Sequence, residues 1–190
     1  MHTYDHAELQ LYLQEHIDGF GALDSIDKFS DGQSNPTYLI TSGAAKYVLR
    51  AKPPGKLLKS AHAVDREFCV LQALAGTDVP VPKMLHLSSD DSPIGTQFFV
   101  MDYLGGRIFW DPALPDLTNE ERAAIYDAMN ITLAALHSID PTSVGLSDYG
   151  KPGNYFERQV SRWSQQYKAA ETQNLPDADY VMDWLTANMP

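Results

Sequence analysis

The stretch FSDGQSNPTYLI at residues 29–40, followed by YVLR at residues 47–50, decides how the first part of this chain folds. A small polar turn separates two runs of strand-forming residues, and Ser42-Gly43 marks a hairpin before a third run. Arg50 stands near the end of that third run. The pattern predicts three successive strands, at residues 25–29, 37–41 and 46–51.

Apolar residues at helical spacing flank these strands. One predicted helix covers residues 5–17 and places Leu9 and Leu13 on the same face. A second covers residues 63–75 and is followed by a glycine, a common helix end. Two shorter runs, at residues 83–87 and 96–102, are typical of a further hairpin.

After Gly105-Gly106 the pattern predicts helices only. Residues 118–121 form a capping box that opens one helix, and further helices are expected at residues 155–171 and 176–189. The order of elements predicts an α+β fold with two domains, residues 1–104 and residues 105–190. In the first of these late helices we expect four side chains to face the core, those of Ile125, Met129, Leu133 and Leu136.

The composition describes an acidic chain with enough apolar residues for a core. Of 190 residues 44% are hydrophobic, and the formal net charge of -11 argues against binding to nucleic acid or anionic membranes. The single cysteine, Cys69, excludes an internal disulfide and is expected to be a small core residue. The histidines show no metal-ligand spacing, and the first residues lack a secretory signal, so we expect a cytoplasmic protein without a metal site.

Glu67 is the residue that points most clearly to a functional ion pair. It follows Val64 by three positions, so its carboxylate is expected at the buried edge of the predicted helix. Because an unpaired buried charge is very costly, this carboxylate needs a cation, and Arg50 is the best placed. A solvated Glu67 paired with Arg66 or Lys59 agrees with the spacing about as well.

The polar turn has the composition of an anion-binding loop. Gly32 permits a tight backbone, while Ser34 and Asn35 offer short polar side chains and backbone N–H groups. Such a loop could fold over nucleotide phosphates while a cation from the neighbouring strand pairs with them. A plain hairpin turn explains the same residues more simply.

The run FFVMDYLGG at residues 98–106 is a buried strand that becomes polar and then flexible. A strand that leaves the core offers backbone carbonyl and N–H groups to the edge of an adenine ring. Such a segment is more commonly a domain linker that binds no ligand.

Taken together and in order, these segments resemble the aminoglycoside phosphotransferase family, small-molecule kinases with a protein-kinase-like fold. The likeness rests on the polar turn with Tyr38, on YVLR at 47–50, on AHAVDREF at 61–68 and on VMDY at 100–103. Lys52-Pro53-Pro54-Gly55 is similar to the branch fused to, or encoded beside, acyl-CoA dehydrogenases. The resemblance implies an antiparallel β lobe with one inserted helix, followed by the first helices of an incomplete helical lobe.

The resemblance also implies roles for matching positions. Arg50 would take the place of the strand lysine that contacts the ATP phosphates, held by Glu67, with Lys52 as the fallback. Met101 would be the gatekeeper, and the Asp102 carbonyl and Leu104 N–H would bind adenine. The full nucleotide-binding set implied is Gly32, Gln33, Ser34, Asn35, Arg50, Glu67, Met101, Asp102, Tyr103 and Leu104.

The catalytic part of the family pattern is missing from this sequence. The family carries an H-G-D-x-x-x-x-N loop and a later Asp that binds Mg, whereas His137 here is followed by Ser138-Ile139-Asp140. The resemblance therefore implies a chain truncated before its catalytic loop, with no catalytic residue and no Mg ligand. We expect the chain itself to be inactive.

Three functional hypotheses follow, of which the plainest is a soluble α+β domain with no nucleotide site. In a full-length context the protein would be an ATP-dependent phosphotransferase acting on a small-molecule hydroxyl, and the dehydrogenase-linked branch implies a hydroxyacyl group or acyl-CoA as acceptor. Alternatively, the truncated lobe would act as a non-catalytic binding or regulatory module that self-associates through an exposed helical part. The candidate contacts for that association are Trp163, Tyr167, Trp184 and Leu185.

Overall fold

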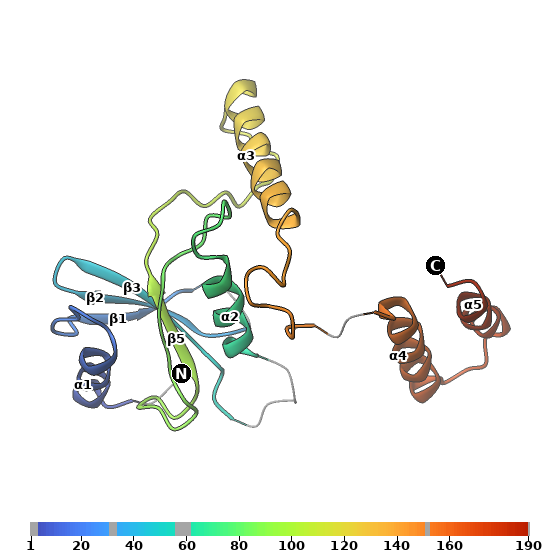
Figure 1. Cartoon of the computed structure of the whole chain (residues 1–190), viewed down its shortest axis with the longest axis horizontal. Coiled ribbons are helices and arrows are strands. Elements are labelled where there is room, and N and C mark those ends of the chain that lie inside the picture. The colour runs from blue at the N-terminus through green and yellow to red at the C-terminus, as the bar shows by residue number, and fades with distance from the viewer. Residues whose placement is uncertain (1–3, 31–33, 56–61, 151–152, 190) are drawn as a thin grey trace. The chain divides into compact units, whose positions relative to one another are not determined.

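The computed structural model describes residues 4–30, 34–55, 62–150 and 153–189. Its centre is a five-stranded antiparallel sheet with the strand order β1-β2-β3-β5-β4 (Figure 1). The predicted strands are confirmed to within two residues at each end. Their bounds are β1 Ser25–Lys28, β2 Thr37–Ser42, β3 Ala45–Ala51, β4 Met84–Leu87 and β5 Phe98–Asp102.

A tight hairpin sets the register of the central strands. The turn between β2 and β3 has Gly43 at φ 61°, a left-handed conformation that glycine adopts without a steric penalty. Ser42 then pairs with Ala45, and the same register continues to Thr37 opposite Arg50. The short loop thus decides which residues of the two strands face each other.

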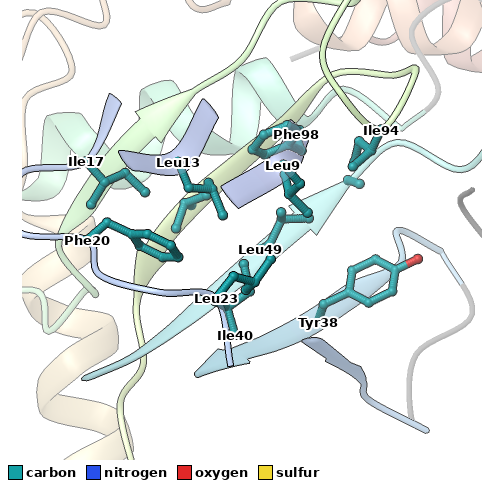
Figure 2. Packing of buried hydrophobic residues seen from close by; sticks show 12 residues of the cluster. Leu9, Leu13, Ile17, Phe20, Leu23, Tyr38, Ile40, Leu49, Ile94 and Phe98 are labelled. Atoms are coloured by element: carbon teal, nitrogen blue, oxygen red, sulfur yellow. The ribbon is translucent and has the colours of Figure 1, made fainter. Parts of the chain in front are cut away.

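The larger core lies between α1 (His6–His16) and one face of the sheet. Asp5 caps this helix by accepting hydrogen bonds from the N–H groups of Ala7 and Glu8. Alternate residues of each strand point toward α1, because side chains of a strand alternate between its two faces. Figure 2 shows the labelled cluster members Leu9, Leu13, Ile17, Phe20, Leu23, Tyr38, Ile40, Leu49, Ile94 and Phe98.

The opposite face of the sheet packs against α2 (Val64–Leu74), which lies on the other side of the sheet from α1 (Figure 1). The core of this face consists of Val64, Phe68 and Phe99, with Met101 packed against it. Cys69 lies on the exposed side of α2, so the prediction of a core cysteine is wrong. It follows Phe68 by one position, which rotates it away from the sheet.

A small polar and aromatic cluster joins α1 to β4. The Tyr12 hydroxyl is hydrogen-bonded to His86 Nε2 at 2.9 Å, and the rings of His16 and His86 lie 4.5 Å apart. Burial, followed by the neighbouring His16, lowers the pKa of His86 below its ordinary value of 6.5. The folded protein therefore favours the neutral form of this imidazole.

We expect this cluster to weaken the fold in mild acid. His86 has a lower pKa when folded, so below about pH 6.5 the unfolded chain binds its proton more readily and the free energy of unfolding falls. The His86→Gln variant, which cannot titrate there, should lose less stability between about pH 7 and about pH 5.5. Thermal unfolding of both proteins across that range measures the difference; parallel losses would contradict the expectation.

The late helices are α3 (Asn119–His137), α4 (Tyr155–Ala170) and α5 (Pro176–Ala187). The predicted capping box is confirmed, since the Thr118 and Glu121 side chains each bind the other residue's backbone N–H. The prediction that α3 has an inward face is wrong, because none of its side chains is buried. Of the four residues predicted to face inward, Met129, Leu133 and Leu136 are exposed and Ile125 is half-buried.

The chain forms two compact units, residues 1–146 and residues 147–190. The first contains the sheet, α1, α2 and α3, and the second contains α4 and α5. The domain boundary predicted between residues 104 and 105 stays a prediction. No helix among the described residues is long and apolar enough to cross a membrane.

Candidate nucleotide site

An ion pair between β3 and α2 forms the centre of the candidate site. Arg50 Nε donates to Glu67 Oε2 at 2.6 Å, and Nη2 donates to Oε1 at 3.4 Å. The strand alternation that buries Leu49 and Ala51 on the α1 side directs Arg50 to the α2 side. The pairing of Arg50 with Glu67 that we predicted from helical spacing is confirmed, and Lys59, one of the alternative cations, lies outside the described residues.

Two residues beside the polar turn complete the surroundings of the guanidinium. Arg50 Nη1 donates to Thr37 Oγ1 at 2.9 Å and to the Asn35 carbonyl at 3.4 Å. The Thr37 hydroxyl donates to that same carbonyl at 3.1 Å. The guanidinium is therefore held from three directions, by a strand, a helix and the end of the turn.

Arg50 keeps the capacity to bind a ligand. A guanidinium has five N–H donors, and the four hydrogen bonds described leave one donor on Nη2. The side chain is 29% exposed, so solvent and solutes reach it. Lys52, the alternative cation, lies beyond the end of β3 and pairs with Asp90 at 3.3 Å. The geometry therefore favours Arg50.

The polar turn itself is described only in part. Gly32 and Gln33 lie outside the described residues. Ser34 is exposed, whereas Asn35 is buried with 4% of its surface exposed. The Asn35 amide donates to Glu67 Oε1 at 2.9 Å, which joins the end of the turn to α2.

The predicted base-binding segment is the exit from β5. Met101 is half-buried in the α2-side core, and its neighbour Asp102 ends the strand. Tyr103 N–H donates to the Lys46 carbonyl, whereas Leu104 is 64% exposed and its N–H has no partner among the described residues. The strand thus leaves the sheet where the resemblance expects adenine to bind.

Sequence reasoning missed Thr37 and His62. The hairpin register could have revealed Thr37, because a two-residue turn after Ser42 places it opposite Arg50. His62 precedes α2, and its Nδ1 lies 2.8 Å from Asn35 Oδ1. No periodicity signals such a contact, since His62 has a left-handed backbone with φ 59° outside any regular element.

The described residues do not fit a metal site. Within them no three His, Cys, Asp or Glu side chains gather in a way that could hold a metal ion. The N–H donors of Arg50 itself are suited to an anion, because a guanidinium recognises phosphate oxygens through charge-assisted hydrogen bonds.

Most of this chain matches a known protein family, and the whole chain matches part of longer proteins. A family profile described as the phosphotransferase enzyme family matches residues 25–190. The Arabidopsis thaliana protein named "Probable acyl-CoA dehydrogenase IBR3" is 47% identical over the whole chain, which covers 24% of that protein. The chain spans about a quarter of the length of the curated relatives that it matches over its whole length.

Comparison with solved structures identifies the fold. A protein from Ralstonia eutropha provisionally assigned as an aminoglycoside phosphotransferase has a TM-score of 0.82 and 46% identity. The match covers 99% of this chain and 54% of that one. A GDP complex of aminoglycoside 2'-phosphotransferase-IIIa matches with a TM-score of 0.54 and 18% identity. The match covers 95% of this chain and 59% of that one. At this identity the likeness shows a common fold and nothing more.

Proposed function

The chain belongs to the phosphotransferase enzyme family, and we propose that it forms the nucleotide-binding part of an ATP-dependent kinase for small molecules. One observation carries this proposal. Arg50 is fixed by Glu67 and Thr37, yet it keeps an exposed edge and a remaining donor. That arrangement suits the oxygens of a polyphosphate.

The base would bind at the exit from β5. Asp102 pairs in register with Tyr47, three residues before Arg50 on the neighbouring strand. Three residues of a strand span about 10 Å, which is comparable to the reach from base to phosphates in a nucleotide. The Asp102 carbonyl and the Leu104 N–H are the groups we assign to the adenine edge, with Met101 behind them and Tyr103 between.

The acceptor would be a hydroxyl group on a small molecule. Relatives named as acyl-CoA dehydrogenases contain a segment similar to this chain and support a hydroxyacyl group or acyl-CoA as that acceptor. The acceptor site, the group that orients the hydroxyl and the Mg ligands would come from residues outside this chain. By itself the chain would bind nucleotide but would not transfer phosphate. We propose the cytoplasm as its location.

Calorimetric titration of nucleotides into the chain tests the proposal. We expect saturable ATP binding with a Kd of about 1 mM or tighter, and adenosine binding at least about tenfold weaker because it lacks the phosphates. GTP should bind more weakly than ATP if the β5 exit selects adenine; equal affinities would reject that base assignment. Equal affinities for ATP and adenosine would contradict a phosphate site at Arg50.

A second candidate function is a non-catalytic module that self-associates. The observation in its favour is the exposure of large apolar side chains in the second unit, among them Trp163, Trp184 and Leu185, while Tyr167 is half-buried. Contiguous apolar surface of this kind is typical of protein contacts. Sedimentation that depends on concentration, without any ATP binding, would favour this function over the first.

A further inference from the structure

Asn35 links the Arg50–Glu67 ion pair to Thr37 and His62. It is 4% exposed, and its backbone carbonyl accepts from Arg50 and from Thr37. Its side-chain Nδ2 donates to Glu67 Oε1 at 2.9 Å, and its Oδ1 lies 2.8 Å from His62 Nδ1. Asn35 therefore contacts both members of the ion pair, Arg50 through its backbone carbonyl and Glu67 through its side-chain amide.

The partners of Asn35 determine which atom of each group carries a proton. Glu67 forms an ion pair with Arg50, and the oxygens of a carboxylate can only accept hydrogen bonds. The Asn35 atom that faces Glu67 must then be the NH2 group, which leaves the carbonyl oxygen facing His62. A carbonyl oxygen only accepts, so His62 Nδ1 must carry the hydrogen.

The backbone holds the imidazole in place for this bond. His62 has a left-handed conformation with φ 59°, and its carbonyl accepts from Val64 N–H at 2.9 Å, at the start of α2. A non-glycine residue seldom adopts this conformation, and such residues cluster where the position of a side chain matters. His62 lies outside the regular elements, so its placement is not a by-product of helix or strand geometry.

We propose that His62 is a positioning residue for the nucleotide site, an inference that rests on the proposed function. Its Nδ1–H fixes the Asn35 carboxamide, the carboxamide directs Glu67, and Glu67 sets the direction of the Arg50 guanidinium toward a phosphate. His62 acts through these residues, and no contact between His62 and the nucleotide is required.

Two variants separate the hydrogen bond from the backbone conformation. Asparagine and glycine both tolerate a left-handed residue, but only asparagine offers an N–H donor at the position of Nδ1. We expect His62→Asn to bind ATP like the wild-type chain. His62→Gly should bind about 2- to 10-fold more weakly, the loss of one hydrogen bond. Calorimetry measures both affinities, with unfolding midpoints recorded for each variant.

A spectroscopic measurement tests the same inference without nucleotide. Nitrogen-15 NMR of the wild-type chain, recorded on the neutral imidazole, should show His62 Nδ1 protonated and Nε2 unprotonated. The opposite tautomer would overturn the proposal, even if a variant failed to fold. This readout distinguishes a specific donor from a histidine that merely fills space.

The outcomes also separate this inference from the proposed function. If wild-type and His62→Asn chains bind ATP and His62→Gly binds equally well, the role of His62 is rejected while the nucleotide site stands. If the wild-type chain does not bind ATP, both proposals fail. Weaker binding by His62→Gly with rescue by His62→Asn, together with the predicted tautomer, supports the positioning role.

Discussion

Replacing Arg50 with methionine is expected to weaken ATP binding by about 10- to 150-fold, the range for losing hydrogen bonds to a charged group. Methionine keeps much of the apolar stem but removes the charge and all five donors. Calorimetric titration of wild-type and variant chains measures the loss. Adenosine should bind both proteins equally, because it has no phosphate for Arg50 to contact.

Two control variants sharpen this prediction. Arg162→Met removes the same charge from an exposed site on α4 and should change ATP affinity by less than about twofold, since exposed surface charges are screened by salt. Arg50→Lys keeps the charge but not the fork that binds Glu67 and Thr37 together, so we expect an intermediate affinity. An Arg50→Met chain that bound ATP like Arg162→Met would rule out Arg50 as a phosphate ligand.

Replacing Leu13 with alanine should lower the free energy of unfolding by about 2 to 5 kcal/mol. Leu13 is fully buried between α1 and the sheet (Figure 2), so the truncation removes apolar contacts and leaves a cavity in the core. Urea denaturation followed by circular dichroism measures the change through the transition midpoint at an unchanged slope.

The same helix provides the matched control. Leu11 is 65% exposed and lies two positions from Leu13, so Leu11→Ala makes the same chemical change in the same helix. Its effect should stay within about 0.5 kcal/mol, as for surface positions generally. Similar losses for the two variants would mean that α1 does not pack on the sheet through its Leu9 and Leu13 face.

Much of the N-terminal fold could be predicted because its signals are local. Alternation in the strand runs and the glycine turn after Ser42 predict β2 and β3, and helical spacing predicts α1 and α2. The Arg50–Glu67 pair could also be predicted, because a carboxylate at the buried edge of a helix needs a cation. Strand alternation placed Arg50 on the facing side.

The faces of the late helices could not be predicted. In α3 the residues Ile125, Met129, Leu133 and Leu136 keep helical spacing, yet none of them is buried. Spacing shows that apolar residues share a face, but burial also requires a second surface, and Ile125 alone of the four is even half-buried. The family match at 54% coverage of a solved relative agrees with a chain that forms part of a larger fold.

By itself the sequence determined the order and type of the elements and the residues that could form an ion pair. These depend on periodicity and turn chemistry within a few neighbouring residues. Only the tertiary structure decided that Asn35, Thr37 and His62 surround that pair. Their contacts join residues 13 to 32 positions apart, and hydrogen bonds over such separations depend on how the sheet, turn and helix pack together.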